Sequence, residues 1–181
     1  MQITPLNLPA EAEQLSQWLL SEPWPFHGQP QASETQLLEK IAQGYFFSSN
    51  HQSFWLATDQ DAQAGFVRIF DLDDIADDGY PMFDLRIRQV WRGQGLGRQA
   101  LQWLTRYVFE TWPALDRMAG TTRLDNHAMR RVFRLCGYVK EGHYRQDWPT
   151  ADGLCLDTVH YAILRQDWLT GQITPVNWLD E

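Results

Sequence analysis

The clearest hydrophobic pattern in the chain is a helical repeat that directly follows an apolar run. Apolar residues recur at every fourth position, at Leu96, Ala100, Leu104 and Val108. This spacing predicts a helix over residues 95–109. The apolar run before it, residues 81–88, predicts a strand. Residues 92–97, with the sequence Arg-Gly-Gln-Gly-Leu-Gly, therefore join the end of a strand to the start of a helix.

The rest of the chain alternates between strand and helix patterns. Six further strands are expected at residues 2–6, 54–58, 65–70, 117–122, 138–147 and 154–164. A first helix opens at Pro9 and ends at residues 21–30, because three prolines and a glycine cannot continue it. A second helix opens with a capping box at Ser33 and ends at Gly44. A fourth helix, after the one at residues 95–109, covers residues 126–136, so the pattern predicts an α+β (α/β) fold.

Size and composition favour one globular domain over residues 1–181. The chain is 44% hydrophobic and 13% aromatic, which is typical of a folded protein. Core packing explains most of the nine Trp residues, and the tail, residues 166–181, is expected to pack against the body. Cys136 and Cys155 lie in different expected elements, form no metal-ligand spacing and favour a reducing compartment. With no signal-peptide pattern at residues 1–7 and no run long enough for a bilayer, we expect a cytoplasmic protein without a membrane partner.

Charge is distributed unevenly along the chain. The net charge is −8, which argues against nucleic acid as a partner. Between Arg86 and Arg134, however, ten Arg residues face only three acidic ones. A basic middle in an acidic chain fits one surface that holds a polyanion and others that attract a cation. Solvated helix faces are the alternative explanation for Arg130, Arg131 and Arg134.

The glycine segment at residues 92–97 is a candidate anion site. At the start of a helix, backbone N–H groups lack partners and the positive end of the helix dipole lies behind them. Phosphate is the anion that such sites bind most often, and glycine lets it approach the backbone closely. The pattern is neither a P-loop nor the dinucleotide fingerprint. An ordinary tight turn at the start of a helix is the alternative.

Three segments, taken together, resemble the GNAT superfamily of acyl-CoA N-acyltransferases. Arg92, Gly95 and Gly97 fill the fixed places of its pyrophosphate-binding signature. Residues 126–139 resemble a later motif, in which an Asn opens a helix that ends in Gly and an aromatic residue. Residues 152–168 resemble the closing strand of the ribosomal-protein N-terminal acetyltransferases (the Rim-type branch). The resemblance covers nearly the whole chain and implies a mixed, mostly antiparallel sheet of about seven strands, with splayed fourth and fifth strands and about four flanking helices.

The resemblance implies acetyl-CoA as cosubstrate. The residues that it assigns to the coenzyme are Ile87, Arg88, Arg92, Gly93, Gln94, Gly95, Leu96, Gly97, Arg98, Asn126 and Phe133. Ile87 and Arg88 pair with the pantetheine arm through their backbone, and the amides of residues 93–98 hold the pyrophosphate. Asn126 is expected to bind pantetheine, to cap its own helix, or to do both. Phe133 flanks the carbons of the thioester.

The resemblance also indicates where proton transfer takes place. Attack by an amine needs a proton acceptor, and Asp84, on the fourth strand, is the candidate. By alternation Asp84 shares a face with Arg86 and Arg88, so a salt-bridged strand residue is the alternative, unless a bulge changes the parity. No general acid is visible, because Phe133 and Met129 stand where the family often carries Tyr or Ser. Core packing is the expectation for Cys136 and Tyr138.

The acceptor site is expected around the first two helices. Trp24, Phe26 and His27 are candidates for an aromatic wall, and anchoring of the loop by buried rings is the alternative. The loop at residues 71–78 carries five Asp residues and is expected to attract cationic acceptors, while no metal site is expected. The predicted function is acetyl transfer to a primary amine, either a protein N-terminus or a small amine such as an aminoglycoside, a polyamine or an amino-acid derivative. A non-catalytic CoA-binding module and a structural adaptor are the competing hypotheses, and a monomer and a homodimer are both compatible with the sequence.

Overall fold

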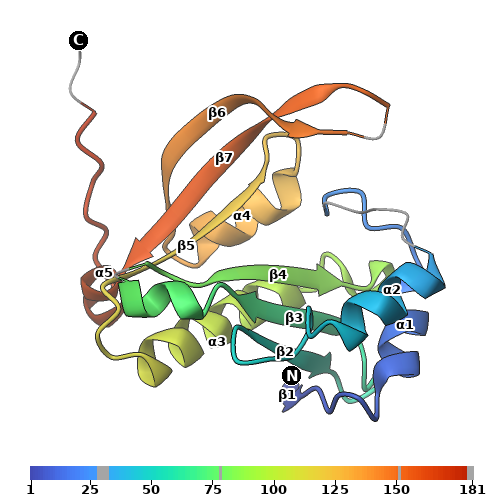
Figure 1. Cartoon of the computed structure of the whole chain (residues 1–181). Helices are drawn as coiled ribbons and strands as arrows, with labels where there is room; N and C mark the ends of the chain where they lie inside the picture. The colour runs from blue at the N-terminus through green and yellow to red at the C-terminus, as the bar shows by residue number, and fades with distance from the viewer. Residues whose placement is uncertain (28–32, 78, 151, 179–181) are drawn as a thin grey trace. The chain divides into compact units, whose positions relative to one another are not determined.

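The computed structural model describes residues 1–27, 33–77, 79–150 and 152–178. These residues form two compact units, 1–100 and 101–181, and each is described by itself. Helix α3 (Leu96–Thr111) begins in the first unit and ends in the second. Figure 1 shows the order of the elements along the chain.

The first unit is built on a four-stranded antiparallel sheet. Its strands lie in the order β1 (Gln2–Pro5), β2 (His51–Ala57), β3 (Gly65–Phe70) and β4 (Met82–Ile87). Sequence order and spatial order coincide, because each strand pairs with the next one along the chain. β4 is therefore an edge strand of this sheet.

Two helices and a tryptophan cluster cover one face of this sheet. α1 (Ala12–Leu20) and α2 (Glu34–Ala42) pack their apolar sides onto it. Trp18 stacks on Trp24, with ring centroids 4.9 Å apart, and meets the edge of Trp55 at 5.5 Å. Burial of large aromatic rings is the main source of stability in such a core. The expectation that most Trp residues serve the core is confirmed for these three.

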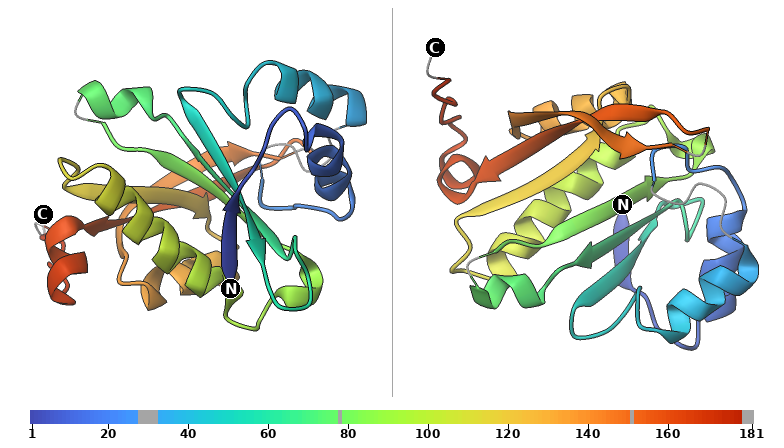
Figure 2. Two further views of the ribbon diagram at one scale, coloured as in Figure 1. Left: turned by 90° about the horizontal axis from the view of Figure 1, so that it is seen from below. Right: turned by 45° about the horizontal axis from the view of Figure 1, so that its top comes forward.

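The second unit contains the other three strands. β5 (Arg117–Arg123) and β6 (Val139–Pro149) both pair with β7 (Cys155–Leu164), all antiparallel, so that β7 is central. α4 (His127–Leu135) connects β5 to β6, and α5 (Arg165–Thr170) follows β7 directly, at the end of that strand (Figure 2).

The expected elements are found, with small shifts at their ends. The first helix begins at Ala12 instead of Pro9, and β2 begins three residues earlier than expected, at His51. The capping box at Ser33 is present as predicted. No helix is predicted in the tail, yet its first residues form α5, and Trp168 packs on Phe109 at 5.3 Å. Two short 3₁₀ turns, Asp73–Asp77 and Gln89–Trp91, are additional.

No helix in the described ranges has the length and apolar character needed to cross a membrane.

Candidate functional site

The glycine segment forms an open turn at the start of α3. Gly93 and Gly95 both have left-handed backbones, with φ of +78° and +85°, a conformation that L side chains adopt only with strain. A Cβ atom built on either glycine would meet no protein atom within 4 Å. Among the described residues, the backbone N–H groups from Gly93 to Gly97 find no acceptor. The turn thus presents a row of free donors to open space, which is the geometry of an anion site.

Arg92 points back toward the protein. Its Nε donates to the carbonyl oxygen of Ile87 at 2.9 Å, and its Nη2 donates to Oε2 of Glu22 at 3.1 Å. The same Glu22 oxygen accepts the backbone N–H of Gln89 at 2.8 Å. Glu22 therefore fixes both ends of the short 3₁₀ turn, and the charge of Arg92 is partly neutralised. A contact between Arg92 and the coenzyme stays a prediction.

A second carboxylate holds the opposite side of the turn. Asp61 accepts the indole N–H of Trp91 at 2.8 Å and lies 3.6 Å from the guanidinium of Arg88. Its other oxygen accepts the backbone N–H of Gln63 at 2.8 Å. Sequence reasoning missed Glu22 and Asp61, because each lies far along the chain from the turn and belongs to no motif.

β4 is regular along its whole length. It pairs with β3 without a register shift, from Met82 opposite Phe70 to Ile87 opposite Gly65. The bulge considered for this strand is absent from residues 82–87, so alternation holds. Asp84 lies opposite Arg68 on the face covered by α1 and α2, while Leu85 and Ile87 belong to the other face.

Asp84 is enclosed by two partners from different elements. Its carboxylate accepts three hydrogen bonds from Arg86, the shortest at 2.7 Å, and its Oδ1 lies 2.9 Å from Nδ1 of His27. Burial alone would raise the pKa of Asp84, but the charge of Arg86 and the contact with His27 outweigh it and hold the pKa far below the ordinary value. A carboxylate with so low a pKa is a weak proton acceptor. The contacts of Asp84 are those of a salt-bridged strand residue, the alternative stated for it from the sequence.

The aromatic residues of the α1–α2 loop have different roles. Trp24 is only 3% exposed, and its indole N–H donates to the carbonyl of Leu19 at 2.8 Å. Trp24 therefore belongs to the core, in agreement with the alternative that buried rings anchor this loop. Phe26 is partly buried, and so is His27, whose ring meets the edge of Trp24 with centroids 6.2 Å apart. Of the expected aromatic wall, His27 is the residue with an established contact to Asp84 among the described residues.

In the second unit, Asn126 caps α4. Its Oδ1 accepts the backbone N–H of Met129 at 3.2 Å, and its Nδ2 donates to Oγ1 of Thr122 at 3.0 Å. The capping alternative is thereby confirmed, and it leaves a contact with pantetheine untested.

Phe133 and Tyr138 form part of the aromatic core of this unit. Phe133 is fully buried and stacks on Tyr161, with centroids 4.8 Å apart and planes at 3°. The hydroxyl of Tyr138 contacts Oγ1 of Thr105 at 2.8 Å and Sδ of Met118 at 3.2 Å. Burial raises the pKa of this phenol. Tyr138 is thus a core residue, as expected.

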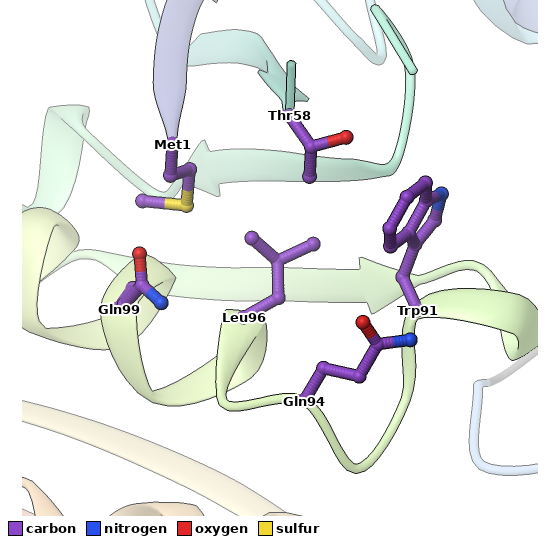
Figure 3. A pocket seen from close by; sticks show the side chains of 6 residues that line it. All are labelled: Met1, Thr58, Trp91, Gln94, Leu96 and Gln99. Atoms are coloured by element: carbon purple, nitrogen blue, oxygen red, sulfur yellow. The ribbon is translucent and has the colours of Figure 1, made fainter. Parts of the chain in front are cut away.

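A shallow depression of about 140 Å³ adjoins the outer side of the glycine turn (Figure 3). Leu96 points toward Met1 and Thr58, while Trp91 and Gln94 flank it and Gln99 lies on the next turn of α3. None of the described side chains that line the depression is charged. It does not fit a diphosphate, which the free N–H groups of the turn suit better.

The structure thus brings several predicted residues together in the first unit. The residues around the turn and β4 are Trp24, His27, Asp84, Ile87, Arg88, Arg92, Gly93, Gln94, Gly95, Leu96, Gly97 and Arg98. Asn126 and Phe133 belong to the second unit. Among the described residues, no group of three His, Cys, Asp or Glu side chains is arranged to hold a metal ion.

Comparison with known proteins agrees with the fold. The Acetyltransferase (GNAT) family matches residues 12–138. No curated protein matches the sequence. Among solved structures, spermidine N-acetyltransferase SpeG from Vibrio cholerae is similar in several forms.

Three of these structures illustrate the degree of similarity. A SpeG mutant has a TM-score of 0.74 at 18% identity, covering 94% of this chain and 99% of that chain. SpeG in complex with CoA and spermine has a TM-score of 0.73 at 19% identity, with 93% and 98% covered. SpeG with manganese ions has a TM-score of 0.73 at 19% identity, with 94% and 96% covered. At such identity the likeness shows the fold alone, and the resemblance to the Rim-type branch finds no support among these three structures.

The family match covers residues of both units, from the start of α1 to the residue before β6, and includes the open glycine turn. The chain therefore belongs to the GNAT acetyltransferase family and is an acetyl-CoA-dependent N-acetyltransferase.

Proposed function

We propose that the chain acetylates an aliphatic primary amine while the N–H groups of residues 93–97 hold the diphosphate of acetyl-CoA. The observation that carries the proposal is the row of donors without acceptors, behind which α3 runs for sixteen residues. The dipole of such a helix favours an anion at its first turn. Arg98, on that turn, adds a cation.

The end of β4 supplies the next contact of the coenzyme. Ile87 lies on an edge strand. Its carbonyl accepts Nε of Arg92 at 2.9 Å, and its N–H is the group that can pair with a ligand that adds like a further strand. The N–H of Arg88 instead donates to the carbonyl of Ala64 at 3.0 Å. We therefore assign the pantetheine arm to the edge at Ile87. Gln94 contributes its backbone, and the contacts expected from Asn126 and Phe133 stay predictions.

A polyamine such as spermidine is the first acceptor to test. The solved structures compared above are of a spermidine N-acetyltransferase. In this chain, Asp73, Asp74 and Asp77 lie exposed on one short turn, and such a cluster raises the local concentration of a polycation. The resemblance at residues 152–168 keeps a protein N-terminus as the second candidate.

The test is a thiol-release assay with acetyl-CoA and a panel of amines. The panel contains spermidine, spermine, an aminoglycoside and a hexapeptide with a free N-terminus, with the same peptide N-acetylated as the control. Mass spectrometry of the products identifies the acetylated nitrogen. We expect turnover that depends on the amine and is fastest with spermidine. Turnover of the peptide alone would overturn the polyamine assignment, and CoA binding without turnover of any amine would favour a non-catalytic module.

A further inference from the structure

His27 has one ring nitrogen engaged and the other available. Nδ1 lies 2.9 Å from Oδ1 of Asp84. Because Asp84 is ionised and can only accept, Nδ1 carries the proton of that contact, and in the neutral ring Nε2 holds the lone pair. Among the described residues, no partner of Nε2 is found, and the side chain of His27 is 21% exposed. The imidazole therefore presents a basic nitrogen that solvent can reach.

The surroundings hold the imidazole in place. The backbone N–H of His27 donates to the carbonyl of Trp24 at 3.1 Å, and the buried Trp24 ring supports the imidazole edge-on. Arg86 fixes Asp84 with hydrogen bonds from both Nε and Nη2. A histidine whose tautomer and orientation are set by a buried carboxylate is the arrangement that serves general-base catalysis.

The same loop also reaches the coenzyme turn. Glu22 binds Gln89 and Arg92 at the turn, and five residues later His27 binds Asp84 on β4. The guanidinium of Arg92 lies 5.7 Å from the centre of the Trp24 ring. Asp84 and Ile87 are three residues apart on one strand, which is about 10 Å. Residues 22–27 thus connect the proposed diphosphate site to a histidine at short range.

We propose that His27 is the general base of the acetyl transfer and that Asp84 is a positioning residue, an assignment that rests on the proposed function. The lone pair of the neutral acceptor amine attacks the thioester carbon and forms the C–N bond. The C–S bond breaks and CoA leaves as the thiolate. The proton lost by the amine passes to Nε2 of His27, and the imidazolium returns it to solvent. This assignment moves the role of proton acceptor from Asp84 to its partner.

A second His–Asp pair provides a matched control. On the β6–β7 hairpin, Nε2 of His143 lies 2.7 Å from Oδ2 of Asp157. This pair has the same contact chemistry, but His143 is 39% exposed and Asp157 lies on β7 of the second unit. If any histidine paired with a carboxylate affected the rate indirectly, both pairs would do so.

The experiment compares kcat, KM and pH profiles of four proteins with acetyl-CoA and spermidine: the unmodified chain, His27→Asn, Asp84→Asn and His143→Gln. Asn at position 27 keeps an N–H near the place of Nδ1, and Gln at position 143 keeps one near the place of Nε2. Calorimetric binding of CoA to each protein verifies that the turn is intact.

We expect His27→Asn to lower kcat by about 100-fold, with CoA affinity within about twofold of the unmodified chain. The fall of kcat/KM that follows protonation of the imidazole should disappear in this variant, which leaves the fall set by protonation of the acceptor amine itself, whose pKa is about 10. In Asp84→Asn the fall of kcat/KM that follows protonation of the imidazole should move to lower pH, because loss of the carboxylate destabilises the imidazolium. Both variants keep the other charged groups around the imidazole. These groups are Arg86, which binds Asp84, and the pair of Arg92 and Glu22 on the far side of Trp24. His143→Gln should match the unmodified chain.

Two outcomes would overturn the assignment. One is a His27→Asn variant that keeps both the kcat and the imidazole-dependent fall of kcat/KM of the unmodified chain. The other is an equal loss in His143→Gln. If the unmodified chain acetylates neither spermidine nor any other amine of the panel, the proposed function fails instead. In that case, an NMR titration of the His27 ring in the unmodified chain still shows which ring nitrogen carries the proton. A neutral ring with its proton on Nε2 instead of Nδ1 would contradict the assignment independently of activity.

Discussion

Asp84 carries a charge in a place where water is scarce. Its side chain is 13% exposed, and Arg86 and His27 together take both of its oxygens. Its pKa is held far below the ordinary value of about 3.9. A carboxylate with a depressed pKa stabilises the folded chain above the pKa of the unfolded state, and this contribution is lost as the pH falls toward the folded value.

We therefore expect the stability difference between the unmodified chain and Asp84→Asn to depend on pH. At pH 7 the variant should be less stable by about 3 kcal/mol, because it leaves Arg86 without its partner. The difference should narrow between pH 5 and pH 3, measured by urea unfolding. Other acidic groups with lowered pKa, such as Asp125 and Asp157, are common to both proteins and cancel. A difference that stays constant over this range would show that Asp84 is not held ionised.

Tyr138 is a polar residue that serves the core. Replacing it with Phe removes the contacts with Thr105 and Met118, but Thr105 keeps its bond to the carbonyl of Leu101 at 2.8 Å. We expect Tyr138→Phe to lower the free energy of unfolding by about 1 kcal/mol and to leave turnover unchanged. Tyr144→Phe, at an exposed position of β6, is the control. A large loss of kcat in Tyr138→Phe would identify this phenol as the missing general acid.

At the scale of elements, the tetrapeptide Arg-Gln-Asp-Trp shows how far local sequence decides structure. It occurs at residues 145–148, inside β6, and at residues 165–168, at the start of α5. The second copy is fixed by contacts that the first one lacks. Arg165 donates to the carbonyls of Phe109, Trp112 and Leu115, which close the end of α3 and the turn after it.

The two copies allow a matched test. Arg165→Lys should lower the free energy of unfolding by about 2 kcal/mol, because an ammonium cannot reproduce the planar fork that serves three carbonyls. Arg145→Lys should change it by less than about 0.5 kcal/mol at an exposed position. Both values come from urea unfolding at pH 7. Equal effects would mean that the contacts of Arg165 add no stability.

Elements whose signals are local were predictable, and contacts between distant segments were not. The four-residue repeat after Gly95 gave α3, and Ser33 with Gln36 gave the start of α2. The glycine turn could be predicted because its chemistry lies within six residues. Glu22, Asp61 and the His27–Asp84 contact join segments that lie 30 to 70 residues apart, and no spacing rule reports such pairs. The start of α5 was missed because it is stabilised by Arg165 and the packing of Trp168 instead of by a sequence cap.

At the scale of the whole molecule, acidic side chains neutralise part of the positive charge of the basic middle. Five of its Arg residues, at positions 86, 88, 92, 117 and 123, form ion pairs with acidic side chains.

The family match covers residues from both units, and the single domain expected from the sequence stays a prediction. In the first unit, the backbone of the glycine turn is open and suits an anion. The proposed binding of acetyl-CoA depends on this turn.

The claim that the glycine turn binds the diphosphate of CoA is tested most directly by calorimetric titration of CoA into the unmodified chain, Gly95→Ala and Gly153→Ala. Both glycines have left-handed backbones, with φ of +85° and +84°, and an added Cβ meets no protein atom within 4 Å at either. The substitutions therefore cost the free protein similar strain, about 1 to 2 kcal/mol each. Only at position 95 would the methyl group stand where the diphosphate approaches. We predict that Gly95→Ala binds CoA at least about tenfold more weakly, a loss of about 1.4 kcal/mol, while Gly153→Ala keeps the affinity of the unmodified chain. Equal affinity in all three proteins, or no binding by the unmodified chain, would contradict the account.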